Sequence, residues 1–196
     1  MLHAAHAARN GHRKILIYTV DTDVVVLAVA LSCTLNEDTE LWLAFGTGKN
    51  FRYLAAHEMA RSFGLENARV PMFHALTSCD TVSGFAGHGK RKAWAAWMAL
   101  PELTQALASV SSAPDVISDD AMLVIERFVI LLYDRTSTTV DINKARRKLF
   151  AKKNNVLLIP PTKAALVQHV RRAVYQGGHV WGQIQVRAPT LPSPDD

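Results

Sequence analysis

The chain has 196 residues, 49% of them hydrophobic, and carries a formal net charge of +5 with a pI near 9.4. This length and apolar content are enough for a packed domain, which excludes a disordered chain. Cys33 and Cys79 form no CxxC pair, which excludes a disulfide framework and a thiolate zinc site. Asp21 and Asp23 interrupt the longest apolar runs, and the start MLHAAHAARNGHRK lacks the form of a signal peptide. We therefore expect an intracellular protein, nuclear or cytoplasmic, with no membrane partner.

The first part of the chain predicts a parallel α/β unit. Residues 15–20, ILIYTV, form an apolar, β-branched run typical of a strand that is buried on both faces of a parallel sheet. Residues 40–46, ELWLAFG, predict a second strand, and 24–32 are long enough for a crossover helix between the two. A further helix is predicted over 54–63, ending at Gly64.

Helices dominate the chain from Pro71 onward, because apolar residues recur there at helical spacing between prolines. The predicted helices cover 72–79, 90–100, 102–110, 119–133, 142–153 and 162–175. Residues 186–196 are rich in proline and predict a disordered tail. The expected fold is therefore one α/β domain over 1–185, with a sheet-containing half (1–70) followed by a mostly helical half (71–185).

Asp21 and Asp23 follow directly after the first predicted strand. The carboxyl ends of parallel strands are where open α/β sheets place ligands, and paired carboxylates suit Mg²⁺ or Mn²⁺. The alternative is that the two residues cap the next helix, since Asp is favoured at helix N-termini. The residue types alone leave both interpretations open.

A second constellation is HALTSCDTVSGFAGHGKRKAWAAW, from His74 to Trp97. Asp80 follows a predicted helix, and a loop with three glycines then runs into the basic helix start Lys90, Arg91 and Lys92. Backbone N–H groups of such a loop can approach a phosphate while the cations neutralise it. Further basic clusters at 144–153 and 171–172 fit a polyanion-binding surface, although ordinary solvated helix faces have the same composition.

The Asp-x-Asp strand end and the stretch SCDTVSGFAGHGKRKAW together resemble the PIN-like domain of the flap endonuclease superfamily. Ser78 departs from the pattern, because the family usually has Gly there. The chain also resembles a group of animal proteins of mobile-element origin that have an LTGCDT core and a closing RAxYQxGxxWGQ motif. RRAVYQGGHVWGQ, residues 171–183, is close to that motif, so the resemblance covers almost all of the chain.

The resemblance implies a PIN-like (Rossmann-like) sheet and a nuclease that depends on Mg²⁺ or Mn²⁺ and acts on nucleic acid, DNA more than RNA. It implies that Asp21, Asp23 and Asp80 are metal ligands with catalytic roles. It also implies that Gly87, Gly89, Lys90, Arg91 and Lys92 bind the phosphodiester backbone. No Asp or Glu precedes Asp21, whereas the family has further carboxylates there. We therefore expect an N-terminally truncated chain whose metal site is incomplete, with room for one ion only, and whose nuclease activity is partial or lost.

Two alternatives stay open. In a non-enzymatic module, the helical half binds nucleic acid or protein and the carboxylates only cap a helix. In a phosphatase similar to the haloacid dehalogenases, Asp21 is the nucleophile and Asp23 the general acid. The second is disfavoured because the acidic stretch 118–120 precedes a helix and does not follow a strand.

Overall fold

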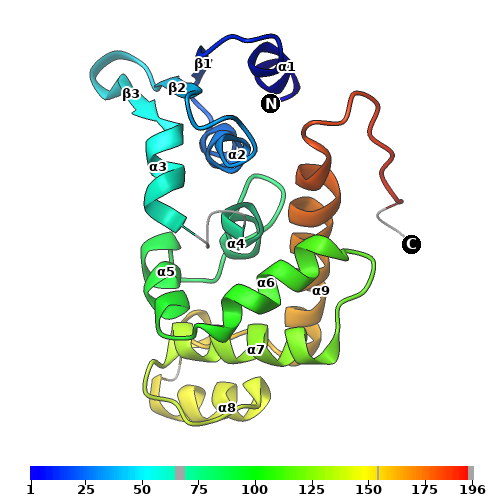
Figure 1. Cartoon of the computed structure of the whole chain (residues 1–196). Helices are drawn as coiled ribbons and strands as arrows, with labels where there is room; N and C mark the ends of the chain where they lie inside the picture. Colours follow the sequence, from blue (N-terminus) through cyan, green and yellow to red (C-terminus); the bar gives the residue numbers. More distant parts are fainter. Residues whose placement is uncertain (65–68, 154, 194–196) are drawn as a thin grey trace. The chain divides into compact units, whose positions relative to one another are not determined.

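The computed structural model describes residues 1–64, 69–153 and 155–193 (Figure 1). The chain divides into two compact units, one formed by Met1–Pro71 with Val180–Asp196 and the other by Met72–His179. The first boundary between the units, after Pro71, lies one residue from the predicted boundary between the sheet-containing half (1–70) and the helical half (71–185). The return of the C-terminal segment to the first unit was not predicted; there, Gln185 Nε2 donates a hydrogen bond to Thr34 Oγ1 at 3.3 Å.

The first unit contains a three-stranded mixed sheet in the order β1-β2-β3. β1 (Lys14–Thr19) pairs in parallel with β2 (Glu40–Phe45), and α2 (Thr22–Ser32) is the crossover between them, which confirms the predicted βαβ unit. The prediction of a wholly parallel sheet is wrong, because β3 (Arg52–Ala55) pairs antiparallel with β2. The other elements of this unit are α1 (Leu2–Arg9), the 3₁₀ turn η1 (Gly48–Asn50), α3 (Ala56–Phe63) and the 3₁₀ turn η5 (Trp181–Gln183).

One face of this sheet carries the core of the first unit. Leu41 and Leu43 of β2 are fully buried, and Ile15 and Ile17 of β1 pack against the same cluster. Ala28, Val29 and Leu31 of α2, Ala56 and Ala60 of α3, and Ala4 and Ala5 of α1 complete it. The small side chains of these helices allow close packing on the strands.

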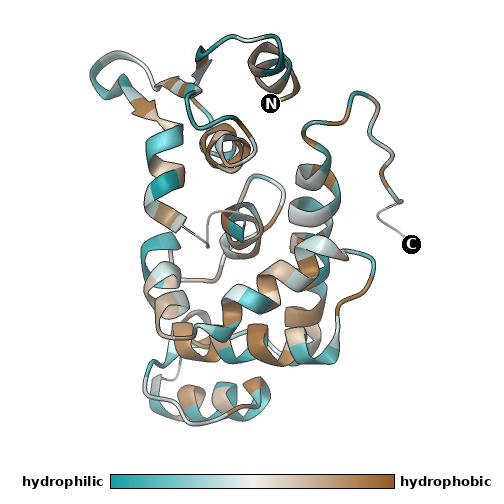
Figure 2. Cartoon of the chain, viewed as in Figure 1, coloured by the Kyte–Doolittle hydropathy of each residue, from teal (hydrophilic) through white to brown (hydrophobic). Residues whose placement is uncertain are grey.

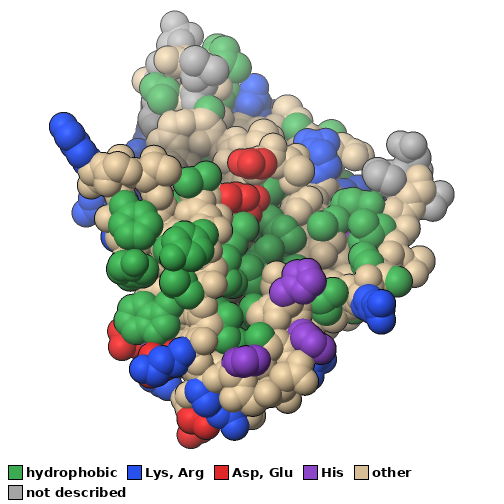
Figure 3. Space-filling view, turned by 90° about the horizontal axis from the view of Figure 1, so that it is seen from above, with side chains coloured by type: hydrophobic (Ala, Val, Ile, Leu, Met, Phe, Trp, Pro, Cys, Tyr) green, Lys and Arg blue, Asp and Glu red, His purple; other side chains and the backbone are tan. Residues whose placement is uncertain are grey.

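The opposite face of the sheet is open, so the prediction that residues 15–20 are buried on both faces is wrong. Exposed residues alternate with half-buried ones along β1, and the side chains of Leu16 and Tyr18 are 44% and 74% exposed. The cause is that the helices of this core pack on one face of the sheet only. Large hydrophobic side chains are accordingly visible on the surface in the space-filling view (Figure 3).

The second unit is helical, as predicted. It comprises α5 (Lys90–Met98), α6 (Glu102–Ser112), α7 (Asp119–Tyr133), α8 (Ile142–Lys153), the 3₁₀ turn η3 (Val156–Leu158) and α9 (Lys163–Val174), while α4 (Val70–Thr77) spans the boundary between the units. α7 contacts α5, α6, α8 and α9, and most of its residues are buried. Figure 1 shows α7 lying between α6 and α8. The hydroxyl groups of Ser118 and Thr162 cap α7 and α9 by accepting hydrogen bonds from backbone N–H groups.

Two of the three glycines in the YQGGHVWGQ stretch, Gly177 and Gly178, lie in the π-helical turn η4 (Tyr175–Val180) and are buried. A Cβ atom at Gly177 would lie 2.9 Å from Met72 Sδ, and one at Gly178 would lie 2.6 Å from Pro114 Cβ. Both distances are shorter than carbon side chains tolerate. The motif that carries part of the family resemblance therefore has a packing role in this chain.

No helix in the described ranges is long and apolar enough to cross a membrane. Residues 186–193 of the predicted disordered tail form neither helix nor strand, but Gln183 holds Thr190 through two hydrogen bonds, of 2.7 and 3.1 Å. Residues 194–196 lie outside the described part.

Candidate nucleic-acid interface

Asp21 and Asp23 lie where the sequence predicts them, at the carboxyl end of β1 and the start of α2. Asp21 is the N-cap of α2, and its Oδ1 accepts a hydrogen bond from the backbone N–H of Asp23 at 2.8 Å. The backbone N–H of Asp21 donates to Thr19 Oγ1 at 3.0 Å, which fixes the turn from strand to helix. One oxygen of Asp21 is therefore used in capping. The capping alternative describes what this residue does, and its second oxygen faces solvent at an exposed position.

Asp80 lies in the second unit, in a tight turn after α4. Cys79 and Val82 pair through two backbone hydrogen bonds, of 3.0 and 3.3 Å, and the Asp80 side chain is exposed between them. Thr81 Oγ1 donates to Gln176 Oε1 at 2.9 Å, which ties this turn to η4. The turn thus presents Asp80 on the surface of its unit.

The turn is strained at Ser78, which has a φ of 142°. A positive φ disfavours residues with a Cβ and favours glycine. Ser78 therefore occupies a backbone conformation that glycine would adopt without strain. A Cβ at Gly84 would lie 3.2 Å from both Ser78 Cβ and the carbonyl oxygen of Thr77, so the glycine loop packs directly against the strained residue.

Two aromatic contacts anchor the glycine loop, residues 84–89, to the helices of its unit. Phe85 is buried, and its ring centroid lies 4.8 Å from that of His169, while the ring of His88 lies 4.3 Å from that of Tyr133. His88 is therefore half-buried. Gly87 and Gly89 remain on the surface, and Gly87 has a φ of +74° that requires glycine.

Burial favours the neutral forms of two side chains beneath the loop, those of Tyr133 and His169. Burial raises the pKa of the Tyr133 hydroxyl above its ordinary value. Burial is also the main cause that lowers the pKa of His169, whose Nε2 donates to the carbonyl oxygen of Leu76 at 2.7 Å.

The three cations at the start of α5 have different surroundings. Lys90 Nζ is directed into the unit, where it donates to the carbonyl oxygens of His74 and Ser78 and to Thr77 Oγ1, at 3.1, 2.5 and 3.2 Å. Lys92 Nζ donates to the carbonyl oxygen of Gly87 at 3.1 Å but stays exposed, and Arg91 is exposed. Arg91 and Lys92 are therefore available to a ligand, and Lys90 supports the turn.

Charge is divided unequally between the units. Residues 72–179 contain 14 Lys and Arg against 8 Asp and Glu, whereas the remaining residues contain 8 against 9. The excess of positive charge in the chain thus belongs to the unit that carries the glycine loop. Sequence reasoning identified the basic clusters but not this partition.

The predicted metal ligands are spread over both units, since Asp21 and Asp23 belong to the first and Asp80 to the second. Across the residues that the structure describes, no group of three or more His, Cys, Asp or Glu side chains is placed to hold a metal ion. Two carboxylates at one strand end are fewer than a closed Mg²⁺ site uses, so any ion there would keep most of its water.

Comparison with protein-family models, with curated protein sequences and with solved structures found no match.

Proposed function

We propose that this chain is a PIN-like, nuclease-related domain that binds the phosphodiester backbone of nucleic acid, DNA in particular, through its second unit. The supporting observation is the surface formed by Gly87, Gly89, Arg91 and Lys92 in the unit that holds the positive charge excess. Exposed backbone N–H groups at a helix start, next to cations, suit a phosphate group.

The proposal includes a divalent ion, Mg²⁺ or Mn²⁺, with Asp21 and Asp23 of the first unit as candidate ligands and Asp80 of the second unit as a further candidate that is tested by itself. When bound, such an ion would neutralise and polarise a phosphodiester. The Asp21 and Asp23 oxygens that are not used in capping have the right chemistry for a hard cation but supply few ligands. We therefore propose weak binding of a single ion and a nuclease activity that is partial or lost.

Binding is tested with an end-labelled 5′-flap DNA at several salt concentrations. We expect the logarithm of the affinity to fall linearly with the logarithm of salt, and Arg91→Ala and Lys92→Ala each to reduce that slope by about one. Lys49→Ala, an exposed cation of the first unit, is the matched control. An affinity that does not depend on salt would refute the phosphate-binding surface.

The metal is tested separately by Mn²⁺ titration and by Mn²⁺-dependent cleavage of the same DNA. Asp21→Asn is informative because asparagine also caps helices, so the variant removes charge and keeps the fold. We expect Asp21→Asn and Asp80→Asn to lower Mn²⁺ affinity, and unchanged affinity would remove the residue from the site. DNA binding that ignores Mn²⁺ altogether would support the second candidate, a non-catalytic nucleic-acid-binding module, which the capping role of Asp21 favours.

A further inference from the structure

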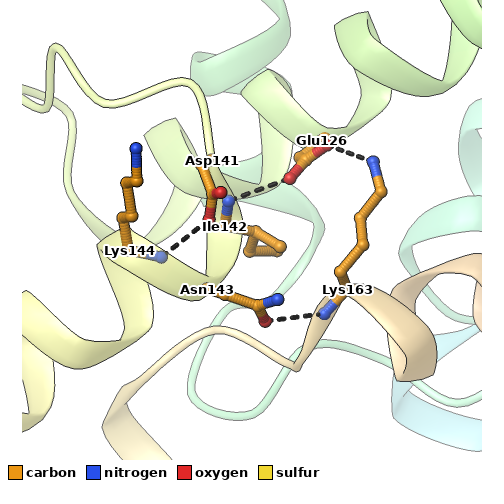
Figure 4. Close-up of polar contacts among 6 residues, drawn as sticks. All are labelled: Glu126, Asp141, Ile142, Asn143, Lys144 and Lys163. Carbon is orange, nitrogen blue, oxygen red and sulfur yellow. Dashed lines mark hydrogen bonds and ion pairs between the residues drawn. The ribbon is translucent and has the colours of Figure 1, made fainter.

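The N-terminal end of α8 is tied to two other helices through one buried carboxylate. Glu126 of α7 is 4% exposed; its Oε1 accepts a hydrogen bond from the backbone N–H of Ile142 at 2.9 Å, and its Oε2 forms an ion pair with Lys163 of α9 (Figure 4). The backbone N–H of Lys163 also donates to Asn143 Oδ1 at 3.0 Å. α8 is therefore held against α7 and the start of α9.

A second contact fixes the middle of α8. Arg146 Nη1 donates to the carbonyl oxygen of Pro160 at 2.5 Å, which joins α8 to the segment before α9. Ile142, Ala145 and Leu149 form the buried face of the helix. The space between α8 and this segment is thus bounded by elements that are held in place, so a ligand would meet a preformed surface.

That space is an apolar groove of about 460 Å³, lined by Arg146, Arg147, Phe150, Ala151, Val156 and Ile159. Phe150 and Val156 are 45% and 61% exposed, although both are large hydrophobic residues. Ile159 is buried and forms the base of the groove. Exposed hydrophobic side chains that gather in a groove mark a surface for a partner.

Arg146 and Arg147 line this groove, and the helix that carries them is strongly basic. Residues 142–153 contain six Lys and Arg and no Asp or Glu, and Lys144, Arg147, Lys148 and Lys152 are exposed. Figure 2 shows hydrophilic and hydrophobic residues alternating along α8. A ligand that fits this surface has apolar side chains, which fill the groove, and negative charge, which faces the arginines that line it.

We propose that the α8 groove binds an acidic amphipathic helix of a partner protein, a function beyond the nucleic-acid binding proposed above. The hydrophobic face of such a helix fills the space beside Phe150 and Val156, and its carboxylates meet Arg147, which lines the groove. A nucleic acid complements the charge but has no aliphatic side chains to fill the groove, so the apolar lining favours a peptide.

The probe is a fluorescein-labelled synthetic peptide with leucines on one helical face and glutamates on the other, measured by anisotropy against the full chain. We expect saturable binding that weakens about tenfold or more when the leucines become alanines or when Phe150 is changed to Ala or Glu. Leu123→Glu is the matched control, because Leu123 of α7 is also exposed and does not line the groove. Circular dichroism of each variant verifies that it is folded.

The outcomes distinguish a groove that binds an amphipathic peptide from a surface that binds any polyanion. Tight binding of the leucine peptide that Phe150→Ala abolishes, with 5′-flap DNA affinity unchanged in the same variant, supports the proposal. Equal binding of the leucine and alanine peptides, loss of DNA binding in Phe150→Ala, or no peptide binding to the folded chain would overturn it. The Arg91 and Lys92 variants test the proposed function independently of this result.

Discussion

Lys90 Nζ lies 2.5 Å from the carbonyl oxygen of Ser78, the residue with a φ of 142°. The same ammonium group also donates to the carbonyl oxygen of His74 and to Thr77 Oγ1. A lysine therefore closes the C-terminal end of α4, where helices leave carbonyl oxygens without intrahelical partners. It supports the turn that carries Asp80.

Lys90→Met is expected to lower the free energy of unfolding by about 1–3 kcal/mol, because three acceptors lose a charged donor. Urea denaturation measures this loss. Arg91→Ala, an exposed neighbour, is expected to stay within about 0.5 kcal/mol of the parent chain while it lowers DNA affinity. The reverse pattern, a stable Lys90 variant that fails to bind DNA, would assign Lys90 to the ligand surface.

Ser78→Gly is expected to raise stability by about 1 kcal/mol, since glycine adopts a positive φ without the strain of a Cβ. For a chain of this length the gain corresponds to an increase in Tm of about 2–4 °C. Ser78→Ala keeps the strain and is the control. A glycine variant that melts below the parent chain would show that the serine hydroxyl contributes more than the strain costs.

Glu126→Gln is expected to cost about 1–3 kcal/mol, because it leaves Lys163 without its buried partner while it keeps an acceptor for Ile142. A double-mutant cycle with Lys163→Met isolates the pairwise energy from the loss of each side chain. Additive effects of the two substitutions would mean that the pair adds nothing beyond the separate contacts.

The free energy of unfolding is expected to fall as pH drops below about 6.5, the ordinary value for histidine. Burial lowers the pKa of His169 in the folded chain, so the unfolded chain takes up a proton first and acid favours unfolding. Denaturation midpoints between about pH 5 and 7.5 measure the slope. His169→Gln is expected to reduce it, and His3→Gln, at an exposed position, to leave it unchanged.

Helical periodicity and capping residues in the sequence were sufficient to predict most of the helices. The predicted bounds of α7 and α8 match the structure, because clear helical periodicity begins directly after Ser118 and Asp141, which cap these helices. β3 was missed because it has four residues and runs into α3 without a turn residue, so Leu54 and Ala55 were assigned to the helix. Trp97, at helical spacing from Ala93, is fully buried and donates to Thr104 Oγ1.

The exposure of β1 and the positions of Lys90 and Glu126 depend on tertiary contacts, which cannot be predicted from the spacing of residues in the sequence. The apolar run of β1 has the same composition whether helices cover one face or both, so its exposure could not be predicted. Lys90 stands in a row of three cations, and nothing in the row marks the one directed inward. Glu126 has the appearance of a solvated helix residue, because its partners Ile142 and Lys163 lie far along the chain.

The open face of the sheet also affects how the chain responds to denaturant. Leu16, Tyr18 and Tyr53 are already 44%, 74% and 59% exposed in the native state, so unfolding transfers less additional surface of these side chains to water than it would if the face were covered. The denaturant dependence of unfolding and the heat-capacity increment both scale with newly exposed surface. Both quantities will therefore be smaller than the length of the chain suggests, and a shallow unfolding curve will be a property of the native fold.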